Sequence, residues 1–231
     1  MSAPDLEYTG LDILRALEEA RNYNRSLADL CERAAGTARV VVDFGAGIGT
    51  FSDLLQDRGF AVRCVEPDGH LASRLREKGY ETFTDLAELP DGSIAYAYTL
   101  NVFEHIEDDR TALRALVAKL RPGARLLIYV PAFAALWTGL DDRVRHYRRY
   151  TRATLDALAA SAGLQVDECR YADSLGFFAT IAFRLIGDKG GNISPAAIKA
   201  YDRFAIPLSM ALDKIAAPFF GKNVYAICTK A

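Results

Sequence analysis

The stretch that decides the fold reads RVVVDFGAGIG and spans residues 39–49. Its first part is a short run rich in β-branched residues, which predicts a buried strand ending at Asp43 and Phe44. The glycine-rich turn that follows lets backbone N–H groups approach an anionic ligand at the start of a helix. A strand, a tight turn and a helix form the opening unit of an α/β sheet.

The rest of the chain continues this alternation. Thr151 is expected to cap a helix that Gly163 ends. The pattern predicts an α/β fold with a Rossmann-like, seven-stranded sheet and helices on both faces. Besides the first, strands are predicted at residues 60–65, 81–83, 94–100, 125–130, 164–171 and 224–229, and helices at residues 51–56, 71–78, 109–120 and 152–162.

Two segments flank or interrupt this pattern. Residues 1–36 are predicted to form an N-terminal helical segment, and residues 37–231 the main domain. Within that domain, residues 173–222 or so are too long a connection for a hairpin loop and are expected to fold as helices beside the sheet. Four interpretations of this helical insert stay open: a cover for the sheet, a dimer face, a lid over an apolar acceptor, and shallow docking on a bilayer surface.

Composition excludes several classes of protein. The chain has 231 residues and is 51% hydrophobic, with 28 Lys and Arg against 30 Asp and Glu, so no basic field directs it to nucleic acid. The first ten residues lack the features of a signal peptide, and no apolar run is long enough to span a membrane. We expect a cytoplasmic monomer or homodimer, with peripheral membrane contact left open. Four scattered cysteines are expected to be reduced and mostly buried: Cys31, Cys64, Cys169 and Cys228.

The residues after the first two strands point to a nucleoside-bearing cofactor. Glu66 lies 23 positions after Asp43, at the end of the second predicted strand, where a carboxylate can accept both hydroxyls of a ribose. The alternative is a set of turn glycines and an unrelated surface Glu. A nicotinamide-dependent oxidoreductase is a rival interpretation, but its dinucleotide-binding loop would carry a third glycine where this chain has Thr50.

Several motifs in order resemble the class I S-adenosylmethionine-dependent methyltransferases near the ubiquinone and menaquinone biosynthesis enzymes. These motifs are the GxGxG loop at residues 45–49, TDL at 84–86, NVFEHI at 101–106, LRPG at 120–123 and HYRRYT at 146–151. The resemblance covers residues 23–171 or so. It implies an antiparallel last strand, S-adenosylmethionine as cofactor and S-adenosylhomocysteine as product. Tyr23 and Asn24 match a segment that folds over the cofactor in relatives, or are solvated helix residues. The implied cofactor-binding residues are Asp43, Gly45, Gly47, Gly49, Glu66, Pro67, Asp85, Leu86 and Asn101.

Methyl transfer is an in-line displacement at a carbon that the sulfonium already activates, so the protein mainly aligns the nucleophile and excludes water. For a hydroxyl acceptor, a His that titrates near neutral pH is the natural proton acceptor. The histidines are His70, His105 and His146. His105 is the first catalytic candidate and His146 the second, whereas His70 is expected at the surface. Alternatively, Glu104 and His105 brace the loop and take no proton.

The methyl acceptor is predicted from the segment after the fifth strand. Residues 141–152 hold five Arg against two Asp, which could bind an acidic group or form an exposed basic loop. The expected acceptor is an oxygen or nitrogen of a small or lipid-bearing molecule. Carbon methylation of a quinone-like ring, or a non-catalytic S-adenosylmethionine-binding subunit, are the alternatives. The predicted acceptor-binding residues are Glu104, Trp137, Arg148 and Arg149.

No metal site is predicted. Some relatives bind a divalent cation with an ExxEH sequence, but Asn101 stands where the first carboxylate would be.

Overall fold

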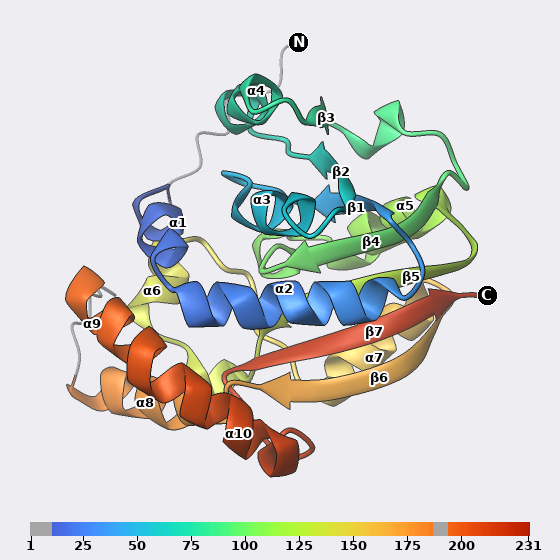
Figure 1. Cartoon of the computed structure of the whole chain (residues 1–231). Coiled ribbons are helices and arrows are strands. Elements are labelled where there is room, and N and C mark those ends of the chain that lie inside the picture. Colours follow the sequence, from blue (N-terminus) through green and yellow to red (C-terminus); the bar gives the residue numbers. More distant parts are fainter. Residues whose placement is uncertain (1–10, 187–193) are drawn as a thin grey trace.

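The computed structural model describes residues 11–186 and 194–231 (Figure 1). In this part of the chain seven strands form one sheet in the order β3-β2-β1-β4-β5-β7-β6. β7 runs antiparallel to both β5 and β6, whereas the remaining pairs are parallel, so the predicted sheet with an antiparallel last strand is confirmed. The strands are β1 (Val40–Phe44), β2 (Ala61–Val65), β3 (Glu81–Phe83), β4 (Ile94–Leu100), β5 (Leu120–Pro131), β6 (Leu164–Ala172) and β7 (Asn223–Lys230).

Helices cover both faces of the sheet, as predicted. Successive residues of a strand point to opposite faces, so Leu127 and Ile128 of β5 belong to two separate cores. One core contains Leu27 and the other Leu113, from helices on the two sides. Helices α2 (Arg21–Ala35), α3 (Thr50–Gln56) and α4 (Gly69–Glu77) contribute to the first core, and α5 (Asp109–Lys119) and α7 (Arg152–Ser161) to the second. All four cysteines are free, as expected: Cys31, Cys64 and Cys228 are buried and Cys169 is half-buried.

Two helices, α1 (Leu11–Glu18) and α2, precede the first strand. α2 shares a core with the sheet, because its Leu27, Ala28 and Cys31 pack in the cluster that holds Tyr96 of β4. Residues 1–10, where no signal peptide was expected, lie outside the described residues.

The segment between β6 and β7 is helical, as predicted. It forms α8 (Ser174–Ile186), α9 (Pro195–Ala200), the π-helical turn η4 (Tyr201–Ala205) and α10 (Ile206–Ala216), while residues 187–193 lie outside the described part. Figure 1 shows these helices together along one side of the molecule, with α8 and α9 near the edge where the parallel strands end. No helix among the described residues is long and apolar enough to cross a membrane.

Element boundaries differ from the prediction where side chains or sheet pairing extend an element. β5 begins at Leu120 and not at Arg125, because Leu120 already pairs with Ile94 across an irregularity in the register. α4 begins at Gly69, since the Asp68 side chain accepts hydrogen bonds from the first N–H groups of this helix. The predicted cap on α7 is confirmed, as the Thr151 hydroxyl accepts from the N–H of Thr154.

Candidate active site

The glycine loop joins β1 to α3 at the carboxyl end of the sheet. Its Gly45 has φ +83°, a left-handed conformation that favours glycine. A Cβ added there would lie 2.4 Å from Cγ2 of Val102, so the loop packs directly on the segment that follows β4. Backbone N–H groups of Gly45 and Ala46 donate to the carbonyl of Val65 at 2.8 and 3.3 Å. The loop is therefore fixed between the ends of β2 and β4.

Glu66 lies directly after β2 and its carboxylate is buried beside this loop. One oxygen accepts a hydrogen bond of 2.7 Å from the N–H of Gly47, and the other accepts one of 3.0 Å from the N–H of Asp68. Burial raises the pKa of Glu66, although the two N–H groups act in the opposite direction. Because a carboxylate has about four lone-pair positions, each oxygen can still accept a further hydroxyl.

Asp43, near the end of β1, is buried underneath the loop. It accepts a hydrogen bond of 2.7 Å from the Ser52 hydroxyl. Burial raises its pKa to about 7, although the bond from Ser52 lowers it.

The other predicted cofactor residues lie at the ends of β2, β3 and β4. Pro67 is exposed next to Glu66, and Asp85 is exposed after β3, where it caps the short helix η1 (Leu86–Glu88) by accepting from the N–H of Ala87. Asn101 follows β4 with φ +55°, a conformation that Asn tolerates better than most residues. The buried hydroxyl of Tyr23 lies against the side chains of Tyr129 and Asn101, and burial raises the pKa of Tyr23 to about 12. The start of α2 thus meets the end of β4.

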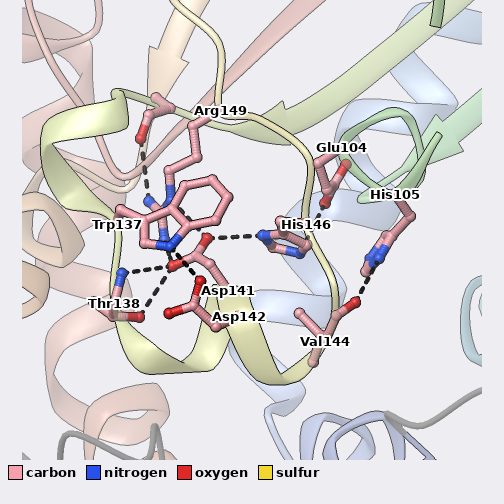
Figure 2. A network of polar contacts seen from close by, with 10 residues as sticks. Glu104, His105, Trp137, Thr138, Asp141, Asp142, Val144, His146 and Arg149 are labelled. Carbon is pink, nitrogen blue, oxygen red and sulfur yellow. Dashed lines mark hydrogen bonds and ion pairs between the residues drawn. The ribbon is translucent and has the colours of Figure 1, made fainter. Parts of the chain in front are cut away.

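A second cluster of polar side chains begins two residues after Val102. Glu104, in the short helix η2 (Phe103–His105), has a buried carboxyl group of which Oε2 has no hydrogen-bond partner. Its Oε1 lies 4.0 Å from Nε2 of His146 (Figure 2). Burial raises the pKa of Glu104 to about 8.

His146 is held from its other nitrogen by Asp141. Nδ1 of His146 lies 2.7 Å from Oδ1 of Asp141. The two side chains face each other because the chain reverses direction after α6 (Gly139–Arg143). The buried Asp141 also accepts from the backbone N–H and the hydroxyl of Thr138 and from two nitrogens of Arg149. Although burial acts in the opposite direction, the bonds from His146 and Arg149 hold the pKa of Asp141 well below its usual range. An ionised carboxylate only accepts, so Nδ1 carries the proton and Nε2 of a neutral His146 has a lone pair directed toward Glu104.

His105 lies beside His146 in a different setting. The two rings meet edge to face with centroids 4.6 Å apart, and Nδ1 of His105 lies 3.0 Å from the carbonyl of Val144. Burial, followed by the effect of the nearby His146, lowers the pKa of His105 to about 4. His105 is therefore neutral at physiological pH.

Arg148 and Arg149 make their hydrogen bonds inside the protein. The guanidinium of Arg149 is only 6% exposed and donates to Asp141 and to the carbonyl of Ala132, which fits neither an exposed basic loop nor an anion clamp open to solvent. Arg148 donates to the carbonyls of Ile106 and Glu107. Trp137, bonded through its indole N–H to Asp142, stands edge-on to the His146 ring at 6.4 Å.

Four of the predicted residues therefore lie in one cluster, namely Glu104, His105, Trp137 and His146 (Figure 2). Sequence reasoning missed Asp141 as the partner of His146, because it counted this Asp only as a charge offsetting the arginines. One ligating atom from each of Glu104, His105 and His146 lies within 4.8 Å of the others, a donor set that transition metals accept. The expected absence of a metal stays a prediction.

An open α/β sheet with an antiparallel last strand, a GxGxG loop after β1 and a carboxylate after β2 defines the class I S-adenosylmethionine-dependent methyltransferases. A family model described as "Methyltransferase domain" matches residues 17–168. The chain belongs to this family, and the resemblance seen in the sequence is confirmed. The cofactor of the class is S-adenosylmethionine.

Curated relatives extend this comparison. A probable S-adenosylmethionine-dependent methyltransferase of Mycolicibacterium smegmatis is 30% identical over 179 residues, which are 74% of this chain and 66% of the relative. An uncharacterized 37.1 kDa protein in transposon TN4556 of Streptomyces fradiae is 28% identical over 76% of this chain and 53% of its own length. A ubiquinone biosynthesis O-methyltransferase of Xanthomonas euvesicatoria is 27% identical over 55% of this chain and 63% of its own length. The chain thus spans about half to two thirds of the relatives that it matches.

Solved structures share the fold at low sequence identity. A putative methyltransferase of Haloferax volcanii, in complex with the Trm112 activator, has a TM-score of 0.64 at 16% identity and covers 99% of both chains. A geranyl diphosphate C-methyltransferase of Streptomyces coelicolor has a TM-score of 0.61 at 13% identity, covering 90% of this chain and 76% of the other. These likenesses are evidence of the fold alone.

Proposed function

We propose that this chain transfers the methyl group of S-adenosylmethionine to an oxygen or nitrogen atom of a small or lipid-bearing acceptor. The observation that carries the proposal is the 2.7 Å contact of His146 Nδ1 with the buried Asp141, which leaves Nε2 directed toward Glu104. Glu104 follows Val102 by two residues, and the glycine loop packs on Val102, so the proposal has the polar cluster adjoin the predicted cofactor site.

The residues around the glycine loop fit the cofactor. Glu66 retains acceptor positions for two ribose hydroxyls, and Asp85 with Leu86 at the end of β3 would contact the adenine. The remaining predicted contacts are Asp43, Gly45, Gly47, Gly49, Pro67 and Asn101. When bound, S-adenosylmethionine supplies a methyl group that its sulfonium already activates.

The chain's own task is then to orient the acceptor and to take its proton. With S-adenosylmethionine bound, the acceptor atom would take the methyl group and the sulfur would leave as the thioether of S-adenosylhomocysteine, while Nε2 of His146 would take the acceptor proton. Asp141 stabilises the imidazolium that results, and Arg149 and Thr138 hold Asp141 in place. Glu104, whose Oε2 is buried without a partner, is suited to orient the acceptor.

We assign the proton to His146 and not to His105, the first candidate from the sequence. A His with a pKa of about 4 is a weak base at neutral pH. His105 instead packs edge-on against the His146 ring and limits its rotation. In this assignment His105 is a positioning residue. Arg149 would act on the acceptor indirectly, by holding Asp141, and Arg148 remains a predicted acceptor-binding residue.

The test uses S-adenosylmethionine carrying a ¹³C or tritiated methyl group, incubated with the small-molecule and lipid fractions of a cell extract. The ¹³C chemical shift of the product separates O-, N- and C-methyl groups. A C-methyl product would establish the quinone-like alternative, and cofactor binding without turnover would establish the non-catalytic subunit. Dialysis against EDTA, which leaves turnover unchanged if no metal acts, tests the predicted absence of a metal.

His146→Ala should lower the turnover rate by about 10²–10⁴-fold, the range of a general base, without changing the Kd for S-adenosylmethionine. Asp141→Asn should lower it as well and shift the pH profile of the rate, because the His146 tautomer is no longer fixed. His70→Ala is the matched control and should leave the rate unchanged. Wild-type turnover by His146→Ala would contradict the assignment.

A further inference from the structure

Exposed apolar side chains are concentrated on the helical insert. Among the described residues, twelve large hydrophobic side chains are exposed, and nine of them belong to α8, η4, α10 and the turn after α10. The other three, Leu17, Val40 and Tyr147, belong to α1, to β1 and to the loop between α6 and α7. The nine are Phe178, Ile181, Leu185, Phe204, Leu208, Met210, Leu212, Ile215 and Phe219, and we call them the apolar face. Single exposed hydrophobic residues are ordinary, whereas a contiguous patch marks an interaction surface.

The segment η4–α10 has its polar side inward and its apolar side outward. Asp202 accepts from the N–H groups of Asn22 and Tyr23 at the start of α2, and Asp213 accepts from the N–H groups of Asp173 and Ser174 at the start of α8. Ser209, between them, is buried and donates to Asp173. The inner side of this segment therefore caps two other helices.

The opposite side of the same segment carries hydrophobic residues at helical spacing. Phe204, Leu208, Leu212, Ile215 and Phe219 follow one another at intervals of four, four, three and four positions, which is one stripe of a helix. A helix of a globular protein normally turns such a stripe to the core. Here it faces outward, with Leu208 61% and Ile215 75% exposed.

α8 adds a second outward stripe and joins it to the first. Phe178, Ile181 and Leu185 lie three and four positions apart and are all exposed. The rings of Phe178 and Phe220 lie 5.4 Å apart, which connects the stripe of α8 with the segment that follows α10. The two helices pack against each other along the side of the molecule shown in Figure 1.

The exposed charged side chains on the described part of the insert are all cationic. Within residues 174–186 and 194–222, the exposed charged side chains are those of Arg184, Lys199, Arg203 and Lys214, of which Lys199 pairs with Glu19 of the segment before α2. The acidic residues of the same ranges, Asp202 and Asp213, point inward and cap helices. The Arg203 guanidinium lies over the ring of Phe204, so cationic and apolar groups share one surface.

This charge distribution distinguishes between two occupants. A two-fold interface with a second copy would bring the same cationic face against itself, which is unfavourable. The surface of a bilayer that contains anionic lipids complements both the cations and the apolar side chains.

We infer that the apolar face of α8, η4 and α10 docks on the surface of an anionic lipid bilayer. The apolar stripes run along α8 and along η4–α10, so these helices would lie in the plane of the interface. The docked helices would lie next to the candidate active site, because α8 contacts the loop after β5. The ring of Phe177 contacts that of Phe133, and Arg184 donates a hydrogen bond to the carbonyl of Ala135. This inference does not depend on the proposed function, because binding to vesicles requires neither acceptor nor turnover.

The experiment is flotation of the full chain with vesicles of phosphatidylcholine alone or of phosphatidylcholine with about one third phosphatidylglycerol. We expect binding to the anionic vesicles that weakens as salt rises. Leu208→Glu with Ile215→Glu should lower the partition by at least about tenfold, because two apolar anchors become anionic. Arg203→Gln or Lys214→Gln should each lower it about fivefold.

Val40→Glu is the matched control, because Val40 is a large exposed hydrophobic residue, 51% exposed, at the start of β1. It should bind vesicles as the wild type does. Unchanged circular dichroism and Kd for S-adenosylmethionine in the Leu208/Ile215 variant exclude misfolding. The inference is overturned if the anionic vesicles do not retain the wild type, or if the Leu208/Ile215 variant binds them equally. It is also overturned if sedimentation finds a wild-type dimer that this variant dissociates while vesicles bind neither protein.

Discussion

Asp202 accepts a hydrogen bond of 2.8 Å from the backbone N–H of Tyr23, 179 positions earlier in the chain. Its other oxygen accepts from the N–H of Asn22 at 3.0 Å, so one carboxylate satisfies two N–H groups at the start of α2. No side chain at the preceding position caps this helix. The insert therefore holds the turn that carries Tyr23 against Asn101 and Tyr129.

Replacing this distant cap should destabilise the protein. We expect Asp202→Ala to lower the free energy of unfolding by about 1–2 kcal/mol, because two N–H groups of a helix terminus lose their acceptor. Chemical denaturation of both proteins measures the difference. Asp57→Ala, a carboxylate exposed at the end of α3, is the control and should change stability by less than about 0.5 kcal/mol. Equal stability of the wild type and Asp202→Ala would show that another group caps α2.

The contact of Gly45 with Val102 predicts a steric effect that can be separated from backbone strain. In Gly45→Ala the new Cβ would lie 2.4 Å from Val102 Cγ2, so the loop must move and the affinity for S-adenosylmethionine should fall. Gly59→Ala is the control: its φ is +84°, but no atom lies within 4 Å of the added Cβ. It should cost about 1–2 kcal/mol of stability from the left-handed backbone and leave affinity unchanged. Adding Val102→Ala to Gly45→Ala should restore part of the affinity in calorimetric titration.

Glu66 should decide cofactor affinity. We expect Glu66→Ala to weaken binding of S-adenosylmethionine and S-adenosylhomocysteine by at least about tenfold, since hydrogen bonds to charged groups contribute about 1.5–3 kcal/mol. Glu66→Gln keeps one acceptor oxygen, so its affinity for S-adenosylmethionine should lie between those of the wild type and Glu66→Ala. Isothermal titration gives the values, with the exposed Glu77→Ala as control. Unchanged affinity in Glu66→Ala would remove this carboxylate from the cofactor site.

Glu104 should make stability depend on pH. Its pKa of about 8 in the folded protein lies above the ordinary value of 4.5, so the folded state holds the proton more tightly than the unfolded chain. The contribution of Glu104 to stability is thus complete below pH 4.5 and is lost as the pH rises through about 8. The side chain of Glu104→Gln cannot ionise. The Tm of this variant minus the Tm of the wild type should therefore increase as the pH rises from about 5 to about 8. A constant difference in Tm over this range would mean that Glu104 is already ionised at pH 5.

Much of the fold follows from local sequence signals. Alternation of short β-branched runs with helical spacing located all seven strands of the described sheet, and Thr151 marked the start of α7. The boundary of β5 was missed because its extension depends on pairing with Ile94 of β4. Such pairing is a long-range contact, and the residues around Pro122 and Gly123 locally resemble a turn.

The site was harder to predict. His146 contacts Asp141 because the chain reverses direction at Arg145, where φ is +58°. Such a left-handed residue can be predicted from sequence mainly where it is glycine or asparagine, and here it is an arginine. One interpretation of the segment around Arg149 was an exposed basic loop, yet the Arg149 side chain is buried against Asp141. Nothing in the sequence indicated that Asp213 caps α8. In both cases a partner in another structural element decided which way the side chain points, and a single sequence contains no record of such partners.

The position of β7 in the sheet constrains the order in which the chain can complete its fold. β7 is the last strand along the chain, but it lies between β5 and β6. A nascent chain that has emerged only as far as Ala172 already contains β6, which then has no strand to pair with. Until residues 223–230 emerge, β5 and β6 each expose an unpaired edge, and such edges are the sites at which chains pair wrongly with one another.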